Sequence, residues 1–197
     1  MKRKKLAIMI CIGVVNLLYA QDGVNLIMNG SFEEGILLWE VPPWINSSIK
    51  PQLDKAIIQG PGSASLSFAG KPNVKAFILQ TIKLKEEMKG KELKISGWIR
   101  TKDFENSWIA AISVECIINK DGKISYKYFG INTPWYLKEL DWTKYEKIFV
   151  LPENPTTLRV ILQTASPTGG FEKSNTGTVW FDNVKLELIN EQTRKEN

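Results

Sequence analysis

Short segments in which apolar and polar residues alternate constrain this chain more than any other feature of its sequence. Such alternation is typical of β-strands that bury one face. Gly, Pro, Asn and Asp separate the segments, and no long amphipathic helical pattern occurs after residue 20. The pattern predicts an all-β protein, either a sandwich or a barrel of antiparallel strands.

The expected strands are distributed along the whole chain beyond its first residues. Between two of them, Asn119–Lys123 predicts a hairpin turn, because Gly122 can adopt a positive φ. The polar residues 190–197 are expected to form a frayed C-terminal tail. The expected strands are Asn25–Met28, Ala56–Ile58, Ser63–Phe68, Ala76–Leu84, Glu92–Thr101, Trp108–Ile118, Ile124–Phe129, Thr143–Val150, Thr157–Thr164 and Thr178–Leu188.

Residues 1–20 predict a secretory signal peptide and not a part of the fold. A basic start, Lys2–Lys5, precedes the apolar run Leu6–Leu18, and Ala20 offers a small residue for cleavage. The apolar run is shorter than the roughly 20 residues that a membrane span needs. We therefore expect a secreted protein, extracellular or periplasmic, with one domain over residues 21–189.

The charge balance argues against nucleic acid as a partner. The chain contains 26 Lys and Arg and 21 Asp and Glu, but four of the basic residues lie in the predicted signal peptide. Their removal leaves 22 basic residues against 21 acidic ones, a net charge of +1. Proteins that bind phosphate backbones usually carry a clear excess of positive charge. Most of the excess positive charge therefore lies in the predicted signal peptide.

The types of reactive residue favour a binding protein over an enzyme. The sequence contains no His, which excludes Ser-His-Asp and Cys-His catalysis. Glu33 and Glu34 are adjacent, and adjacent strand residues point to opposite faces, so they are poor partners for glycoside hydrolysis. Cys116 alternates with Ile112 and Val114, which predicts a small buried hydrophobic residue and not a reactive thiol.

Two segments near the ends of the predicted domain each combine a short apolar strand with a carboxylate. They are Asn25–Gly35, which contains Glu33, and Gly177–Glu187, which contains Asp182. A shared hard cation would explain both carboxylates, because such ions bind carboxylate and backbone carbonyl oxygens. The two could meet only if the first and last strands lie close together. The alternative is that backbone amides cap both carboxylates without a metal.

These two segments, with Asp141–Thr143 and Phe149–Pro152 between them, resemble the carbohydrate-binding modules grouped around families four, nine and twenty-two. The resemblance extends over nearly the whole chain beyond the predicted signal peptide. It implies a two-sheet antiparallel β-sandwich, a jelly roll of the galactose-binding-like type. Such modules are often appended to glycoside hydrolases. The fold itself hosts binders of many ligands, so it does not define the ligand.

The resemblance also implies a structural Ca²⁺ that joins the first and last strands. Glu33 and Asp182 match its acidic ligands, and the carbonyl groups of Ser31 and of the loop 60–63 would complete the shell. Oxygen ligands without any His suit Ca²⁺ and argue against zinc. Asn183 departs from the family pattern, in which many members carry a second Asp.

One sheet face is the expected glycan site. Alternation places Trp98 and Arg100 on the polar face of their strand, and Glu115, Arg159 and Gln163 on the polar faces of two others. If these strands are neighbours in one sheet, they form a polar platform around Trp98. A sugar ring would stack on the indole while the polar groups bond its hydroxyls. The alternative is that Trp98 is covered by a loop or only decorates the surface.

Five of the other six tryptophans divide into two groups. Trp44 follows two prolines and Trp135 lies in a long loop, so both are candidates for ligand-facing rings. Trp39, Trp142 and Trp180 are embedded in motifs that resemble the family and are assigned to the scaffold.

Two functions remain open at this stage. The first is a secreted, non-catalytic module that binds a polysaccharide or oligosaccharide, alone or beside a glycoside hydrolase or a cell-surface partner. The second is a secreted or cell-surface protein-interaction domain on the same fold, without a sugar site. Exposed aromatic side chains that line one groove would favour the first.

Overall fold

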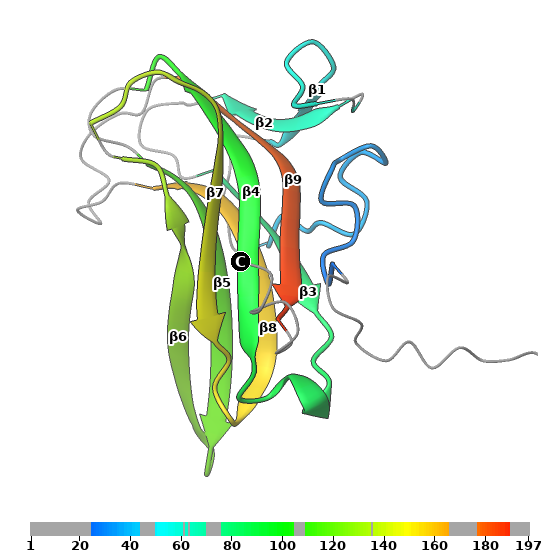
Figure 1. Ribbon diagram of the computed structural model, residues 1–197, viewed down its shortest axis with the longest axis vertical. Coiled ribbons are helices and arrows are strands. Elements are labelled where there is room, and N and C mark those ends of the chain that lie inside the picture. The colour runs from blue at the N-terminus through cyan, green and yellow to red at the C-terminus, as the bar shows by residue number, and fades with distance from the viewer. Residues whose placement is uncertain are drawn as a thin grey trace, which may run out of the picture.

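In the computed structural model, two antiparallel β-sheets stack face to face as a sandwich (Figure 1). The structure describes residues 25–43, 50–60, 62, 64–69, 76–104, 109–134, 136–165 and 177–189. The single helix within these ranges, the 3₁₀ turn η1 (Glu86–Met88), is too short to cross a membrane. The strands are β1 (Gln52–Asp54), β2 (Ser65–Ala69), β3 (Phe77–Ile82), β4 (Glu92–Lys102), β5 (Ile109–Lys120), β6 (Lys123–Asn132), β7 (Leu140–Val150), β8 (Pro155–Ala165) and β9 (Thr178–Leu188).

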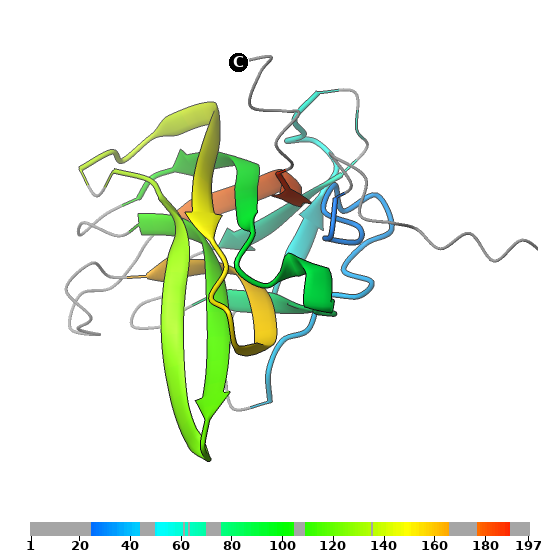
Figure 2. The ribbon, with the colours of Figure 1, turned by 60° about the horizontal axis from the view of Figure 1, so that its bottom comes forward.

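The strand order confirms the predicted fold class, a two-sheet antiparallel sandwich. One sheet has the order β1-β2-β9-β4-β7 and the other the order β3-β8-β5-β6. Consecutive long strands are mostly divided between the sheets, so the chain crosses repeatedly from one layer to the other. The β5–β6 hairpin is the exception, and Figures 1 and 2 show its tip extending beyond the neighbouring strands.

The core lies between the sheets, where the apolar face of each strand points. Leu93, Ile95 and Ile99 of β4 are fully buried, as are Ile112 and Val114 of β5. The alternation in the sequence therefore predicts the buried face of these strands correctly. Cys116 is also fully buried, as expected, and burial raises the pKa of its thiol.

The opening segment, residues 25–43, ties the two sheets together along one side of the sandwich (Figure 1). Its first residues pair with β9, where the Leu26 amide donates to the Leu186 carbonyl at 2.7 Å. Its later part pairs with β3, where Glu40 and Leu79 exchange two backbone hydrogen bonds of 2.7 and 2.9 Å. The predicted closeness of the first and last segments of the domain is thus confirmed.

Two of the expected strands are wrong. Asn25–Met28 makes only an isolated bridge to β9, and Ala56–Ile58 is a bend that follows the short strand β1. The reason for the bend is local, because Asp54 Oδ1 accepts hydrogen bonds from the amides of Ala56 and Ile57 at 2.8 and 2.9 Å. A side-chain oxygen that bonds amides two and three residues later stabilises a turn and not a strand.

The predicted hairpin between β5 and β6 is confirmed. Asp121 and Gly122 both adopt positive φ values, 53° and 76°. Two consecutive positive φ values are typical of the tight turn whose twist matches that of antiparallel strands. The turn fixes the register of β6, which forms the open edge of the four-stranded sheet.

Candidate functional site

The residues predicted to form one platform lie on the outer faces of two different sheets. Trp98 and Arg100 lie on β4 in the five-stranded sheet, whereas Glu115 lies on β5 and Arg159 and Gln163 lie on β8 in the four-stranded sheet. The prediction of a single platform around Trp98 is therefore wrong. Although β4 and β5 are consecutive in the chain, they belong to different layers, so their outward side chains point to opposite sides of the sandwich.

The other three predicted residues do share a face, the outer face of the four-stranded sheet. Glu115 stands opposite Arg159 in the register, and its Oε1 lies 3.1 Å from Arg159 Nη1. On its other side stands Tyr128, whose hydroxyl donates a hydrogen bond to Glu115 Oε2 at 3.0 Å. Gln163 Nε2 donates to Ser113 Oγ at 3.1 Å. Polar groups with fixed orientations thus form a band across β8, β5 and β6.

Two tyrosines on β6, neither of them predicted as a site residue, extend this face to the edge of the sheet. Tyr126 and Tyr128 are 53% and 63% exposed. Their rings are nearly parallel, with centroids 6.4 Å apart and planes inclined by 13°. The alternation of Ile124, Tyr126 and Tyr128 beside a hairpin turn was the sequence signal for them, because residues two apart on a strand share a face.

The surroundings of the Tyr128 hydroxyl raise its pKa. Partial burial raises its pKa, and the hydrogen bond to the Glu115 carboxylate raises that pKa further. A protonated phenol donates to Glu115 and keeps its own lone pairs available as acceptors. The band therefore presents both donors and acceptors beside two flat aromatic rings, a combination that suits a ligand with many hydroxyl groups.

On the opposite face, Arg100 belongs to a chain of side-chain contacts that reaches the edge strand β1 through Trp180. Its guanidinium lies over the Trp180 ring, 5.8 Å from the centroid, and its Nη1 lies 3.6 Å from Asp141 Oδ1. Trp180 Nε1 in turn donates to Asp54 Oδ2 at 2.8 Å. Burial would raise the pKa of Asp54, but hydrogen bonds from Trp180, Ile57 and Ala56 outweigh it and lower that pKa. These contacts connect β4 to β7 and β9 and, through Trp180, to β1.

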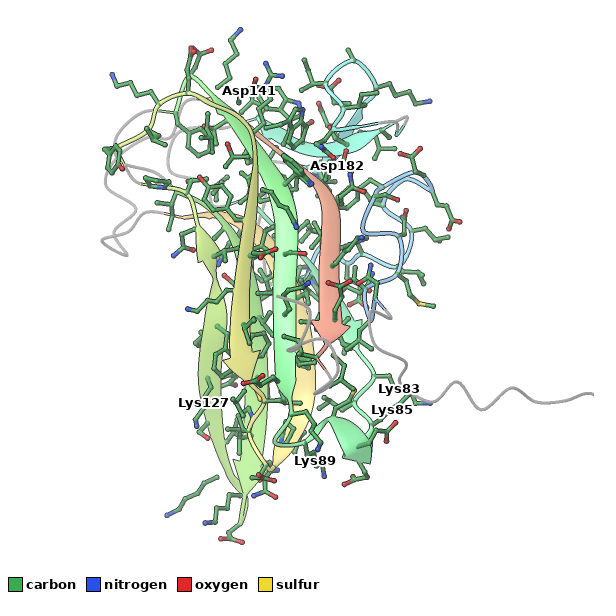
Figure 3. The ribbon with its side chains drawn as sticks, viewed as in Figure 1. Lys83, Lys85, Lys89, Lys127, Asp141 and Asp182 are labelled. Carbon is green, nitrogen blue, oxygen red and sulfur yellow. The ribbon has the colours of Figure 1, made fainter. Side chains whose placement is uncertain are left out.

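Trp98 is half-buried on the same face, beside a hollow of about 350 Å³. In the register it stands opposite Lys144 of β7 and opposite Asp182 of β9. Figure 3 shows Asp182 on β9, near the opening segment and the β1–β2 pair. Trp98 is thus separated by the whole thickness of the sandwich from the tyrosine pair.

The predicted cation ligands Glu33 and Asp182 lie close together. The Asp182 side chain is 1% exposed and accepts hydrogen bonds from the amides of Gln59 and Asn183 at 3.2 and 2.7 Å. Burial raises the pKa of Asp182 to about 6, and the charge of Glu33 adds to that rise. The ion pairs between described residues include none with Asp182, so two neighbouring carboxylates meet there without a basic partner for Asp182.

The chemistry of this donor set fits a hard cation. No group of three or more His, Cys, Asp or Glu occurs within the described part of the chain, so backbone carbonyls would have to supply further ligands. Ser31 follows Gly30, whose carbonyl accepts from the Val184 amide at 2.9 Å, so Ser31 lies beside the segment that carries Asp182. Asn183 keeps a positive φ of 49° and donates from Nδ2 to Gln59 Oε1 at 2.8 Å, which suits Asn at this position.

Two further site candidates, Trp44 and Trp135, lie outside the described residues, as do the predicted signal peptide and the C-terminal tail. The scaffold assignment of Trp39 is confirmed. It is buried, its ring centroid lies 5.5 Å from that of Phe32, and its Nε1 donates to the Asn29 carbonyl at 3.1 Å.

No model of a known protein family matches this sequence, and no curated protein does either. Solved structures match its fold, which confirms the resemblance to carbohydrate-binding modules at the level of architecture. The module "Family 16 Carbohydrate Binding Module-2" aligns with a TM-score of 0.61 and 20% identity, over 82% of this chain and 99% of that one. The CBM22-2 xylan-binding domain of Paenibacillus barcinonensis Xyn10C aligns with a TM-score of 0.56 and 19% identity, over 81% of this chain and 98% of that one.

One similar structure belongs to an enzyme. The enzymatically active domain of tailspike protein 4 of bacteriophage CBA120 aligns with a TM-score of 0.61 and 17% identity. The alignment covers 84% of this chain but only 21% of the tailspike chain. The same sandwich therefore occurs both in binding modules and as one part of a larger chain.

Proposed function

We propose that this protein is a secreted, non-catalytic glycan-binding module whose site is the outer face of the four-stranded sheet. The observation that carries the proposal is the exposed, nearly parallel pair Tyr126 and Tyr128 beside the polar band around Glu115. Secretion follows from the predicted signal peptide, and the glycan from the chemistry of this face.

The face suits sugars because a pyranose ring has two chemically different parts. Its flat C–H surfaces are apolar and its edges carry hydroxyl groups. Exposed tyrosine rings can cover the former at a low cost in side-chain entropy. Arg159, Glu115 and Gln163 can bond the latter, and bonds that involve a charged partner are the stronger ones. Two rings side by side on one strand favour a chain of sugar units over a single sugar.

A binding role is also favoured over hydrolysis. Hydrolysis of a glycosidic bond requires two carboxyl groups that flank the bond, with the acid held protonated. Glu115 is flanked by Arg159 and Tyr128 instead, and both of its carboxylate oxygens are engaged by these two side chains. The modules of families 16 and 22 that share this fold are named for carbohydrate or xylan binding, which supports the choice of ligand class.

We further propose that Ca²⁺ bound by Glu33, Asp182 and the Ser31 carbonyl stabilises the fold. The support is the meeting of two carboxylates at a place where the opening segment joins β9. An ion that binds only the folded state, present at 100 times its dissociation constant, would add about 2.7 kcal/mol to the free energy of unfolding. Chelation should then lower the melting temperature by roughly 5–10 °C. An unchanged melting temperature would exclude the metal.

The glycan proposal is tested by calorimetric titration of the domain with soluble xylan, β-glucan and mannan. We expect saturable binding to at least one polymer. The variants Tyr126→Ala and Tyr128→Ala should each weaken it about tenfold or more, because full burial of a large apolar side chain is worth about 1.5 kcal/mol or more. Val150→Ala is the matched control, since Val150 is an exposed apolar residue that alternates with the buried Phe149 and therefore lies on the outer face of the other sheet.

Two results would contradict the proposal. One is a folded protein that binds none of the three polymers and no oligosaccharide derived from them. The other is binding that survives loss of both tyrosines. Either would favour the alternative function, a protein-interaction domain on the same fold.

A further inference from the structure

We infer that the hollow around Trp98, on the outer face of the five-stranded sheet, is a second and independent site that binds an acidic sugar unit. Its volume, about 350 Å³, falls within the range of ligand pockets, about 300–1,000 Å³. Strand β4 forms the floor with Ser96 and Trp98, and Ser96 is only 3% exposed. Lys144 of β7 forms one wall, and Lys185 and Glu187 of β9 form the other.

An irregularity in β9 shapes this second wall. Between Asp182 and Lys185 the strand contains one residue more than β4 does between Trp98 and Ser96, so the register shifts there. An extra residue in one strand bends it and redirects its side chains, and such bulges are frequent next to binding sites. Here the bulge brings Lys185 opposite the small floor residue Ser96, where its long side chain borders open space.

The hollow carries an excess of positive charge. Among the described residues that line it, three are lysines and one, Glu187, carries a carboxylate. Lys94 is 3.2 Å from Glu187, and Lys144 is 3.1 Å from Glu146 in a pair that is exposed on both sides. Lys185 is exposed and takes part in no ion pair with another described residue. Its ammonium group is therefore available to an incoming anion.

A flat aromatic ring next to ammonium groups indicates a ligand that has an apolar face and a carboxylate. A residue directly opposite on a neighbouring strand lies about 5 Å away between Cβ atoms, so Lys144 and Trp98 can contact the same small molecule. A uronic acid meets both requirements with one ring. Glu187 closes one end of the hollow and repels carboxylates, so the acid group would point toward Lys144 and Lys185.

The same reasoning disfavours other anions. Inorganic phosphate would use the lysines but leave the indole without a partner. A nucleic-acid strand needs a path of positive charge that follows several phosphates and successive aromatic platforms. The described lining of this hollow contains one indole, and a carboxylate lies at one end of it.

The test is titration of the full-length mature protein with trigalacturonate, followed through the indole N–H signals in two-dimensional NMR. Its methyl ester is the matched ligand, because it keeps the sugar rings and removes the charge. We expect saturable binding of trigalacturonate, at least fivefold weaker binding of the ester, and loss of binding in Trp98→Ala. Lys185→Gln should weaken binding about tenfold, as expected for loss of a charged hydrogen-bond donor.

Two controls separate this site from others. Lys147→Gln makes the same change in charge on β7, at a position opposite Ile95 and thus on the other face of the strand, and should leave the affinity unchanged. Tyr128→Ala should also leave it unchanged, so failure of this inference is distinguishable from failure of the proposed glycan site. Each of four results would overturn the inference. Two concern charge: equal binding of the acid and the ester, or an unchanged affinity in Lys185→Gln. Two concern the site and the ligand class: loss of binding in Tyr128→Ala, or displacement of trigalacturonate by an oligothymidylate at a concentration lower than that of trigalacturonate.

Discussion

Gly97 sets how closely the two sheets approach, and its replacement by Ala should destabilise the fold through one identifiable contact. It lies on the inner face of β4, and a Cβ atom there would be 2.5 Å from Ile112 Cδ1 and 3.5 Å from Val184 Cγ2. Favourable contacts between carbon atoms lie at about 3.5–4.0 Å. Ile112 is fully buried, so its side chain cannot avoid the new methyl group by moving into solvent.

The magnitude follows from two opposing effects. Extra volume in a packed core costs about 1–3 kcal/mol. Replacing Gly by Ala within a strand recovers about 0.5–1 kcal/mol of backbone entropy. We therefore expect Gly97→Ala to lower the free energy of unfolding by about 1–2 kcal/mol, which corresponds to a melting temperature lower by roughly 3–6 °C.

The assay is equilibrium urea unfolding followed by circular dichroism, for both single variants and the double variant. Ile112→Val removes the Cδ1 atom and should itself cost about 0.5–1.5 kcal/mol. In the Ile112→Val background, Gly97→Ala should be neutral or stabilising, so the two changes couple by about 1 kcal/mol or more. Wild-type stability of Gly97→Ala, or strictly additive effects in the double variant, would refute this account of the sheet contact.

Three further predictions concern individual side chains. With a chelator present, the raised pKa of Asp182, about 6 against 3.8, means that the folded state holds this proton more tightly than the unfolded state does. The free energy of unfolding should therefore fall as the pH rises from about 4 to about 6, by at most about 3 kcal/mol. Urea midpoints measured across this range should no longer depend on pH in this way in Asp182→Asn. In excess Ca²⁺ the midpoints of the unchanged protein should rise with pH instead. Asp54→Ala should lower the free energy of unfolding by about 1–3 kcal/mol, because Trp180 Nε1 loses its acceptor. Urea unfolding followed by indole fluorescence measures this, and an unchanged free energy of unfolding would contradict it. Cys116 should resist iodoacetamide in the native protein and react only above the unfolding transition, and mass spectrometry that finds native modification would contradict its burial.

The two faces of the sandwich differ in what they offer a ligand. The face of the four-stranded sheet combines a pair of exposed rings with a band of hydrogen-bonded polar groups at an open edge. The face of the five-stranded sheet has a single half-buried indole in a small hollow with surplus positive charge. Under the two proposals above, the first face would take an extended neutral chain and the second a single charged unit of a mixed polysaccharide.

The strands and their buried faces could be predicted from the sequence, because period-two alternation is a local property of the chain. It placed Trp98 and Arg100 on the outer face of β4, and the residues that alternate with them, such as Ile95 and Ile99, are buried. The turn at Asp121 and Gly122 followed from local signals of the same kind. The prediction of a strand at Ala56–Ile58 was wrong for a reason that is also local. Asp54 Oδ1 accepts hydrogen bonds from the amides of Ala56 and Ile57, which stabilises a turn there.

Only the tertiary structure decided which polar faces share a surface. Alternation states that Trp98 and Glu115 point away from the core, but not that their strands belong to opposite layers, because strand pairing is a long-range choice. The same pairing placed Tyr128 beside Glu115 and brought Glu33 to Asp182 from the two ends of the domain. The sequence determined what each strand presents, and the packing of the sheets determined which of these groups meet.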